Sequence, residues 1–203
     1  MTETRTQQLY RSLIALGLAL TCAVAIAQTV ILQGSGPGNV QGTGVGNVRG
    51  TATPAPTSSN YCDGRFTVWS DSTNVVVDND SGLTWTRNAN LDGTKNWSNA
   101  VAYCSNLTYA TSSDWRLPSI AELSRDERYG GTTNGLADAY PSTNNPALPL
   151  GHPFINVQSD DYWSSTTYTE DTLDAWYAYL ANGDVWYDNK ISYSAYVWPC
   201  RGP

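Results

Sequence analysis

The clearest hydrophobic pattern in the chain is the stripe of a helix that begins near residue 97. Apolar side chains recur there with helical spacing, at Trp97, Ala100, Val101, Cys104 and Leu107. Residues three and four apart share one face of an α-helix, so this segment predicts an amphipathic helix with one buried side. A second helix is expected to begin at Ser119, because Glu122 follows three residues later and completes a capping box.

A pair of short strands is predicted before the first helix. Residues 75–77 and 83–85 are β-branched or apolar, and the turn-forming segment Asp78–Gly82 separates them. That segment also resembles the start of a calcium-binding loop. An EF-hand loop would need an acid at its twelfth position, where this chain has Ala89, so a tight turn is expected instead.

A strand hairpin is predicted near the C-terminus. Apolar and aromatic side chains alternate there, with Trp176 on the face expected to be buried and Tyr177 and Tyr179 on the other. Asn182-Gly183 is then expected to form a two-residue type I′ turn into a strand over residues 184–187. The predicted class is α+β, with two helices followed by a short-stranded antiparallel sheet.

The first 27 residues have the pattern of a secretory signal peptide. Arg5 and Arg11 precede an apolar run, and Ala25-Ile26-Ala27 fits a small-x-small cleavage site. Extended to Leu32, the run would reach the length of a membrane span, so a membrane anchor is the alternative if the segment stays uncleaved. Export indicates an extracellular or cell-surface location, with the periplasm as the alternative.

Residues 28–60 differ in composition from the rest of the chain, because they are rich in Gly and Pro and hold no aromatic residue. Such a segment buries too little apolar area to order itself, which favours a flexible linker. A short internal repeat, residues 38–45 followed by 46–51, leaves open a strand that pairs with a neighbouring subunit. Residues 61–203 hold all eight Trp and have the size of one domain. Within them, residues 125–157 form a loop-rich connection that is expected to be functional or mobile.

The chain is acidic, and its charge is unevenly distributed. Loss of the first 27 residues would leave 17 acidic and 9 basic residues, a net charge of −8. From Tyr129 to Asn189 there are eight acids and no Lys or Arg. A surface of that sign repels phosphates and sulfated polymers, which argues against nucleic acid as a partner. Neutral sugars, cationic groups or a bound cation remain compatible.

Three cysteines remain after cleavage: Cys62, Cys104 and Cys200. In an oxidising compartment two are expected to pair, and a bond between Cys104 and Cys200 would tie the first helix to the last strand. The closed loop of about 95 residues would stabilise the fold by roughly 4–5 kcal/mol in the chain-entropy model. Cys62 would then be left over for a bond between chains. Three buried reduced thiols are the alternative.

A series of short motifs follows a characteristic order along the chain. The first half contains Leu83-Thr84-Trp85, the helix with Cys104, Asp114-Trp115-Arg116-Leu117-Pro118 and Ile120-Ala121-Glu122-Leu123. The second half contains Tyr162-Trp163-Ser164-Ser165-Thr166, Ala175-Trp176-Tyr177, Asn182-Gly183 and Cys200-Arg201-Gly202. In this order they resemble the C-terminal domain of bacterial collagen-like adhesins, a family of secreted domains, over about 143 of the 203 residues.

The resemblance implies a C-type-lectin-like fold, in the branch that includes formylglycine-generating enzymes and the variable proteins of diversity-generating retroelements. In the family this domain follows a repetitive stalk, trimerises and is associated with binding glycosaminoglycans, so a homo-oligomer is one expectation. This chain departs from the family in two ways. It has no collagen stalk, and its acidic C-terminal half opposes a polyanionic ligand.

The motif at residues 114–118 is expected to be structural. A strand-to-helix corner with Trp115 buried and Arg116 paired to Asp114 explains these residues without a ligand.

The aromatic and polar residues near the C-terminus are the predicted binding surface. Rigid aromatic side chains mixed with short polar ones offer contact area at low entropic cost. Sugar rings would stack on Trp or Tyr faces while their hydroxyls bond to Asp and Asn. The predicted ligand-binding residues are Tyr177, Tyr179, Asp184, Trp186, Tyr187, Asn189 and Tyr193. Trp163, Trp176 and Cys200 are expected to belong to the scaffold.

No catalytic constellation is expected. His152 is the only histidine, so neither a Ser-His-Asp nor a Cys-His arrangement can form. Formylglycine-type oxidation would need two reactive cysteines, and these are assigned to the disulfide. Asp160 and Asp161 are the candidates for a calcium site, and no other cofactor is expected.

The sequence thus predicts an exported, non-catalytic, adhesin-like domain that binds a carbohydrate or protein group at a surface. The alternative is a structural subunit of an extracellular fibre or appendage. In that case residues 30–49 would add a strand to the next subunit, and Cys62 would cross-link chains.

Overall fold

The computed structural model describes residues 57–203. The predicted signal peptide, residues 28–56 of the predicted linker and the strand proposed for residues 30–49 lie outside the described residues. Ser58–Tyr61 form strand β1, so the folded region begins a few residues before the predicted domain boundary. None of the described helices is long and apolar enough to cross a membrane.

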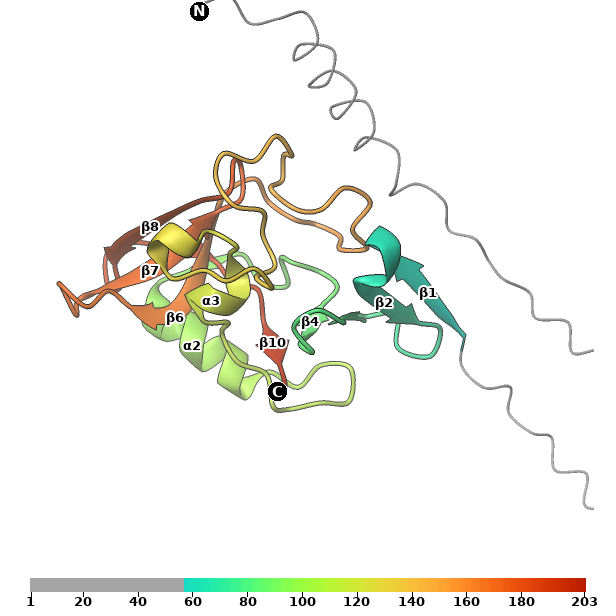
Figure 1. Ribbon diagram of the computed structural model, residues 1–203. Helices are drawn as coiled ribbons and strands as arrows, with labels where there is room; N and C mark the ends of the chain where they lie inside the picture. The colour runs from blue at the N-terminus through green and yellow to red at the C-terminus, as the bar shows by residue number, and fades with distance from the viewer. Residues whose placement is uncertain (1–56) are drawn as a thin grey trace, which may run out of the picture.

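The strands of the described region form two five-stranded sheets (Figure 1). The first has the order β1-β2-β3-β4-β10, with β2 at Phe66–Trp69, β3 at Val75–Asp78, β4 at Thr84–Thr86 and β10 at Cys200–Arg201. The second has the order β5-β9-β6-β7-β8, with β5 at Thr94–Lys95, β9 at Ala195–Tyr196, β6 at Asp161–Thr167, β7 at Asp174–Tyr179 and β8 at Asp184–Asn189. Within these sheets the strands pair antiparallel, apart from a parallel bridge between β6 and β9. The mixed helix-and-sheet class is confirmed, with two sheets where one was predicted, because β1 to β4 pair with one another and with β10 and not with β5 to β9.

The predicted turn between β3 and β4 is confirmed. Asp78 N donates to Leu83 O, and Gly82 N donates to Asp78 O, both at 2.8 Å. Gly82 has a φ of +74°, in the left-handed region that favours glycine. The buried Asp78 carboxylate accepts hydrogen bonds from Arg65 Nε and Nη2 at 3.2 and 2.9 Å, so Asp78 has a structural role.

Both predicted helices are present. Helix α2 spans Trp97–Asn106, and the side chain of Asn96 caps its N-terminus. Helix α3 spans Ile120–Leu123 and begins with the predicted capping box between Ser119 and Glu122. Two short 3₁₀ helices, η1 and η2, cover Cys62–Gly64 and Glu127–Tyr129.

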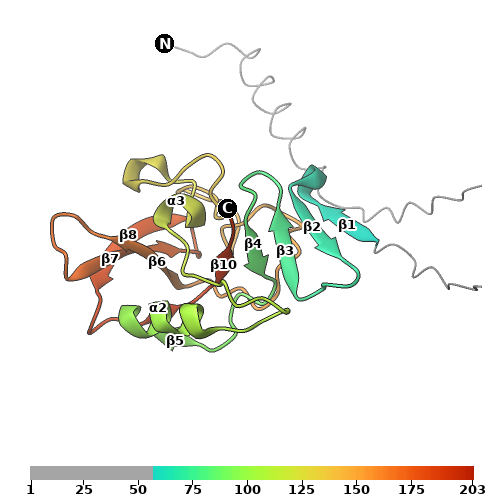
Figure 2. The ribbon, with the colours of Figure 1, turned by 90° about the horizontal axis from the view of Figure 1, so that it is seen from below.

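The two helices cover opposite faces of the second sheet (Figure 2). Ala100 and Cys104 of α2 pack in one hydrophobic cluster with Trp163 of β6. Leu123, the last residue of α3, packs in the other cluster with Tyr162 of β6. Because neighbouring residues of a strand point to opposite faces, β6 is buried on both sides at this position.

Strand β6 contains a bulge at its Ser164-Ser165-Thr166 motif. Trp163 pairs with Tyr177 and Thr167 pairs with Ala175, so the three motif residues stand opposite Trp176 alone. Three hydrogen bonds satisfy polar groups of the bulge. Trp97 Nε1 donates to Ser164 O, and Ile120 N donates to Thr166 Oγ1. Ser165 N donates to Pro118 O. The bulge thereby ties β6 to α2 and α3.

The hairpin between β7 and β8 is present, but the predicted two-residue turn is wrong. Tyr179 pairs with Asp184, so the four residues Leu180–Gly183 form the loop. Leu180 is fully buried, and its N–H donates to Asp160 O at 3.0 Å, which takes it out of the strand ladder. The Asn-Gly signal located the turn, whereas burial of Leu180 set its length.

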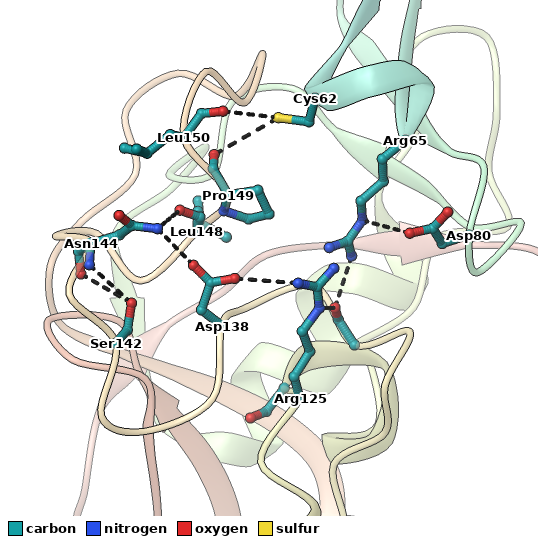
Figure 3. Close-up of polar contacts among 12 residues, drawn as sticks. Cys62, Arg65, Asp80, Arg125, Asp138, Ser142, Asn144, Leu148, Pro149 and Leu150 are labelled. Atoms are coloured by element: carbon teal, nitrogen blue, oxygen red, sulfur yellow. Dashed lines mark hydrogen bonds and ion pairs between the residues drawn. The ribbon is translucent and has the colours of Figure 1, made fainter. Parts of the chain in front are cut away.

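Polar contacts hold the long connection over residues 125–157 (Figure 3). The carbonyl of Gly135 accepts a hydrogen bond from Arg65 Nη2 at 2.8 Å and another from Arg125 Nε at 3.1 Å. Arg125 also pairs with Asp138 at 3.4 Å. The connection is therefore attached to the residue that precedes β2 in the first sheet.

Candidate ligand-binding surface

Strands β7 and β8 carry most of the predicted binding residues, and their register divides these residues between two faces. Cross-strand partners, and residues two apart in one strand, point to the same side. Tyr177 pairs with Trp186 and Tyr179 with Asp184, so one side, here called the Trp186 face, carries Tyr177, Tyr179, Asp184, Trp186 and Asp188. The other side, here called the Tyr187 face, carries Trp176, Ala178, Val185, Tyr187 and Asn189. The predicted residues therefore do not form one continuous surface.

Trp186 is the most exposed aromatic side chain of this surface. Its exposed fraction is 54 %. The indole N–H donates to Asp184 Oδ2 at 2.9 Å, which satisfies the polar atom and restricts the orientation of the ring. More than half of the side chain is accessible, and its cross-strand partner on the neighbouring strand is Tyr177.

Tyr177 and Tyr193 connect the Trp186 face to the core. Their rings stack at a centroid distance of 5.6 Å, and each ring also packs edge-on against Trp163. The Tyr193 hydroxyl donates to Asp161 Oδ2. Burial raises the pKa of the Asp161 carboxyl, the hydrogen bond from Tyr193 opposes that effect, and nearby Asp160 and Asp188 add to it. Asp161, predicted only as a calcium candidate, pairs with Tyr179 and therefore lies on the Trp186 face, on the strand next to β7.

The Tyr187 face carries an aromatic cluster that the sequence analysis did not identify as a unit. Tyr187 stacks on Tyr168 with ring centroids 3.9 Å apart and planes 10° apart. Trp176 packs edge-on against both rings, and Tyr129 of η2 also contacts Trp176. Trp176, predicted as a scaffold residue, is half-buried at the centre of this cluster. No sequence signal pointed to Tyr129 and Tyr168, because they come from a 3₁₀ helix and from the loop that follows β6.

Asn189 has a local structural role at the end of β8. Its side-chain oxygen accepts hydrogen bonds from the backbone N–H groups of Ile191 and Ser192, at 3.1 and 3.2 Å. The side chain therefore shapes the turn that leads to Tyr193. Of the two predicted polar contacts, Asp184 and Asn189, only Asp184 lies on the Trp186 face.

The predicted disulfide between Cys104 and Cys200 is wrong, because the structure leaves both as free thiols. Cys104 packs on the α2 side with Trp163, whereas Cys200 packs with Trp85 in the other cluster. Burial raises the pKa of each thiol to about 12. Cys62 Sγ donates to Leu150 O at 3.1 Å (Figure 3), and its predicted bond to a second chain stays a prediction.

The corner at residues 114–118 is structural as predicted, but the partner of Arg116 differs. Arg116 binds Glu122 of the capping box through two contacts of 2.8 and 2.6 Å, and Asp114 pairs with Arg201 at 3.3 Å. Trp115 is buried. The spacing within the motif predicted an ion pair between Asp114 and Arg116, whereas in the structure α3 places Glu122 beside Arg116.

Asp160, Asp161 and His152 each make local contacts. Asp160 Oδ1 accepts from the N–H of Asp161, and the Asp161 carboxylate accepts from Tyr193. Among residues 57–203, no group of three or more His, Cys, Asp and Glu side chains is placed to hold a metal ion. Burial lowers the pKa of His152, whose ring lies 5.8 Å from that of Phe154.

A shallow polar hollow lies beside β5 and the start of α2. Its volume is about 520 Å³, and its lining residues are Thr94, Lys95, Asn96, Asn99, Ile191 and Ser194. None of the predicted site residues lines it.

The described fold is a mixed helix-and-sheet domain whose second sheet ends in an aromatic and acidic edge. Residues 74–201 match the family described as the Lcl C-terminal domain. This match covers more than half of the chain, and the chain belongs to that family. The resemblance to the C-terminal domain of collagen-like adhesins is thereby confirmed. No curated protein matches the chain.

Proposed function

We propose that this protein is an exported, non-catalytic, adhesin-like domain of C-type-lectin-like fold that binds a carbohydrate or protein group at a surface. Membership of the Lcl C-terminal domain family supports an adhesin-related role. The observation that carries the proposal is Trp186, which is 54 % exposed while Asp184 holds its indole N–H. A large apolar ring kept open in a restricted orientation is typical of a contact residue.

The binding element in this proposal is the Trp186 face. Tyr177 and Tyr193 pack against the buried Trp163, so their rings are rigid before a ligand arrives. Little side-chain entropy is then lost on binding, which favours affinity. The hydroxyl groups of the tyrosines and the carboxylates beside them supply the polar contacts that orient a ligand.

Binding to an array of glycans and extracellular-matrix proteins tests this function. Trp186→Ala is expected to abolish the signal of any ligand that the protein captures. Trp69→Ala is the matched control, because Trp69 is 41 % exposed but lies on β2 of the first sheet. Equal loss of binding in both variants, or no loss in Trp186→Ala, would contradict a site on β7 and β8.

The second candidate function is a subunit of an extracellular fibre, and the position of β1 favours it. This strand is at the edge of the first sheet, and Ser58, Ser59 and Asn60 are exposed. An exposed edge strand offers backbone groups that a strand from another chain can pair with. Light scattering and non-reducing gel electrophoresis test this role. A monomer in both measurements contradicts it.

A further inference from the structure

We infer that the Trp186 face binds a basic segment of a partner protein, with lysine or arginine side chains as the contacting groups. This inference rests on the proposed binding function and names the chemistry of its ligand. It is carried by the charge of the face, by the spacing of its carboxylates and by the open ring between them.

Carboxylates surround Trp186 on its own face. Asp184 and Asp188 lie two residues before and after it on β8, and therefore point to the same side. Asp161 stands on β6 opposite Tyr179 of β7, which extends the acidic face across a third strand. The pKa of Tyr177 is raised to about 12 by burial first and then by Asp161, Asp188 and Asp184, so these three charges act on one ring.

The negative charge of these acids is largely uncompensated, because the neighbouring basic residues bind other groups. In the described region, neither Asp161 nor Asp188 takes part in an ion pair. Arg128 lies 3.8 Å from Asp184, but its close partner is Asp126 at 2.6 Å. The Lys190 ammonium donates to Thr167 and Thr172 and lies over the ring of Trp97. A cationic ligand would supply the missing charge.

The aromatic rings favour the same kind of ligand. The face of an indole or phenol ring attracts ammonium and guanidinium groups through its negative quadrupole. Trp186 is 54 % exposed, and its N–H is already bound by Asp184, so the accessible part of its side chain is available for such a contact. A sulfated or phosphorylated ligand would instead approach three carboxylates of its own sign.

The spacing of the acids fits an extended peptide better than a single metal ion. Asp184 and Asp188 are four residues apart on one strand, which places their Cα atoms roughly 13 Å apart. One cation cannot bridge that distance, because carboxylate oxygens ligate calcium at about 2.3–2.6 Å. Basic side chains four residues apart in an extended segment have the same spacing. The peptide segment between the two basic side chains would then lie across the ring of Trp186.

A direct test uses a fluorescent nine-residue Gly/Ser peptide with Lys at its third and seventh positions. Fluorescence polarisation with the full chain is measured at low and at high salt, beside the same peptide with acetylated lysines and beside a heparin fragment. We expect the lysine peptide alone to bind, and its affinity to fall with salt. Equal binding of the acetylated peptide, or binding of the heparin fragment alone, overturns the inference.

Two pairs of variants separate a site from the net negative charge of the protein. Asp188→Asn should weaken binding about three- to fivefold, and Trp186→Ala about tenfold. Their controls should leave affinity unchanged: Asp71→Asn removes an exposed acid from the turn between β2 and β3, and Trp69→Ala removes an exposed indole from β2. Equal weakening by Asp71→Asn would show that only overall charge attracts the peptide, which also overturns the inference.

Failure of the inference and failure of the proposed function give different results. If the array finds a ligand that Trp186→Ala loses while the lysine peptide does not bind, the cationic chemistry is wrong and the binding function stands. If neither the array nor the peptide shows binding that depends on Trp186, both proposals fail.

Discussion

Tyr177 and Trp186 are direct cross-strand partners, and they join the core of the second sheet to its open edge. The ring of Tyr177 packs edge-on against the fully buried Trp163 at a centroid distance of 5.9 Å. Its partner Trp186 is 54 % exposed. The row Trp163, Tyr177 and Trp186 therefore runs from a buried scaffold residue to an exposed contact residue, and variants at its two ends should behave differently.

Truncation of the buried and of the exposed tryptophan should have unequal effects on stability. Trp163→Ala leaves a cavity in the core and is expected to lower the free energy of unfolding by about 3–5 kcal/mol. Trp186→Ala removes a largely solvated ring, so a loss below about 1 kcal/mol is expected. Urea denaturation monitored by circular dichroism measures both. A comparable loss in the two variants would make Trp186 a core residue.

The thiols of Cys104 and Cys200 should be reduced and unreactive in the folded protein. With Cys62→Ser as background, the melting temperature is expected to be the same with and without dithiothreitol. A thiol reagent at pH 8 should modify neither cysteine until the protein unfolds, because burial raises the pKa of both thiols to about 12. A fall in melting temperature on reduction would indicate a disulfide.

These raised thiol pKa values also predict a loss of stability at alkaline pH. The unfolded thiols ionise near their usual pKa of 9.0, while the folded thiols stay protonated to about 12. The contribution of the two protonated thiols to the free energy of unfolding is therefore fully present below pH 9 and falls as the pH rises from 9 towards 12. The double variant Cys104→Ala with Cys200→Ala should show a shallower decline over that range. An unchanged slope would show that other groups cause the decline.

Asp161→Asn should stabilise the protein at neutral pH. The pKa of Asp161 is raised in the folded state, chiefly by burial, so its contribution is largest in acid and is lost as the pH rises through the folded pKa. Asparagine keeps an acceptor for the Tyr193 hydroxyl and removes the charge. The melting temperature should therefore rise at pH 7 and be unchanged near pH 3. A lower value at pH 7 would show that the charge itself is needed, with Asp71→Asn as the control for net charge.

Gly135→Ala should destabilise the long connection strongly. A Cβ atom at this position would lie 2.0 Å from Ser124 O, so the backbone must move, and the carbonyl of Gly135 would shift away from Arg65 and Arg125. A loss of about 2–4 kcal/mol is expected. Gly93→Ala is the matched control, since a Cβ there meets nothing within 4 Å and only its φ of +67° is unfavourable, at about 1 kcal/mol. Chemical denaturation compares them, and equal losses would contradict the steric explanation.

Local signals in the sequence predicted the elements of the fold well. The spacing of Ala100 and Cys104 located α2, and the capping box of Ser119 and Glu122 located the start of α3. Gly82 marked a turn because the turn needs a left-handed residue. In each case the interacting groups are within a few residues of one another, so the pattern itself contains the cause.

The predicted binding residues were close in sequence but were divided by strand geometry. Trp186 and Tyr187 are neighbours in the chain, yet they point to opposite sides of β8. The sequence showed the alternation without showing which side α2 and α3 would cover. Tyr168 reaches Tyr187 only because the loop after β6 brings it there.

The sequence by itself determined the positions of the helices and turns, the acidic charge of the C-terminal half and the family, because these depend on local spacing and composition. Only the tertiary structure decided that Arg116 binds Glu122, that Cys104 and Cys200 remain separate thiols and that Trp186 stays open. The physical reason is that these outcomes depend on burial and on pairing between strands. Such contacts join residues from separate elements, and no local pattern records which of the available partners they will meet.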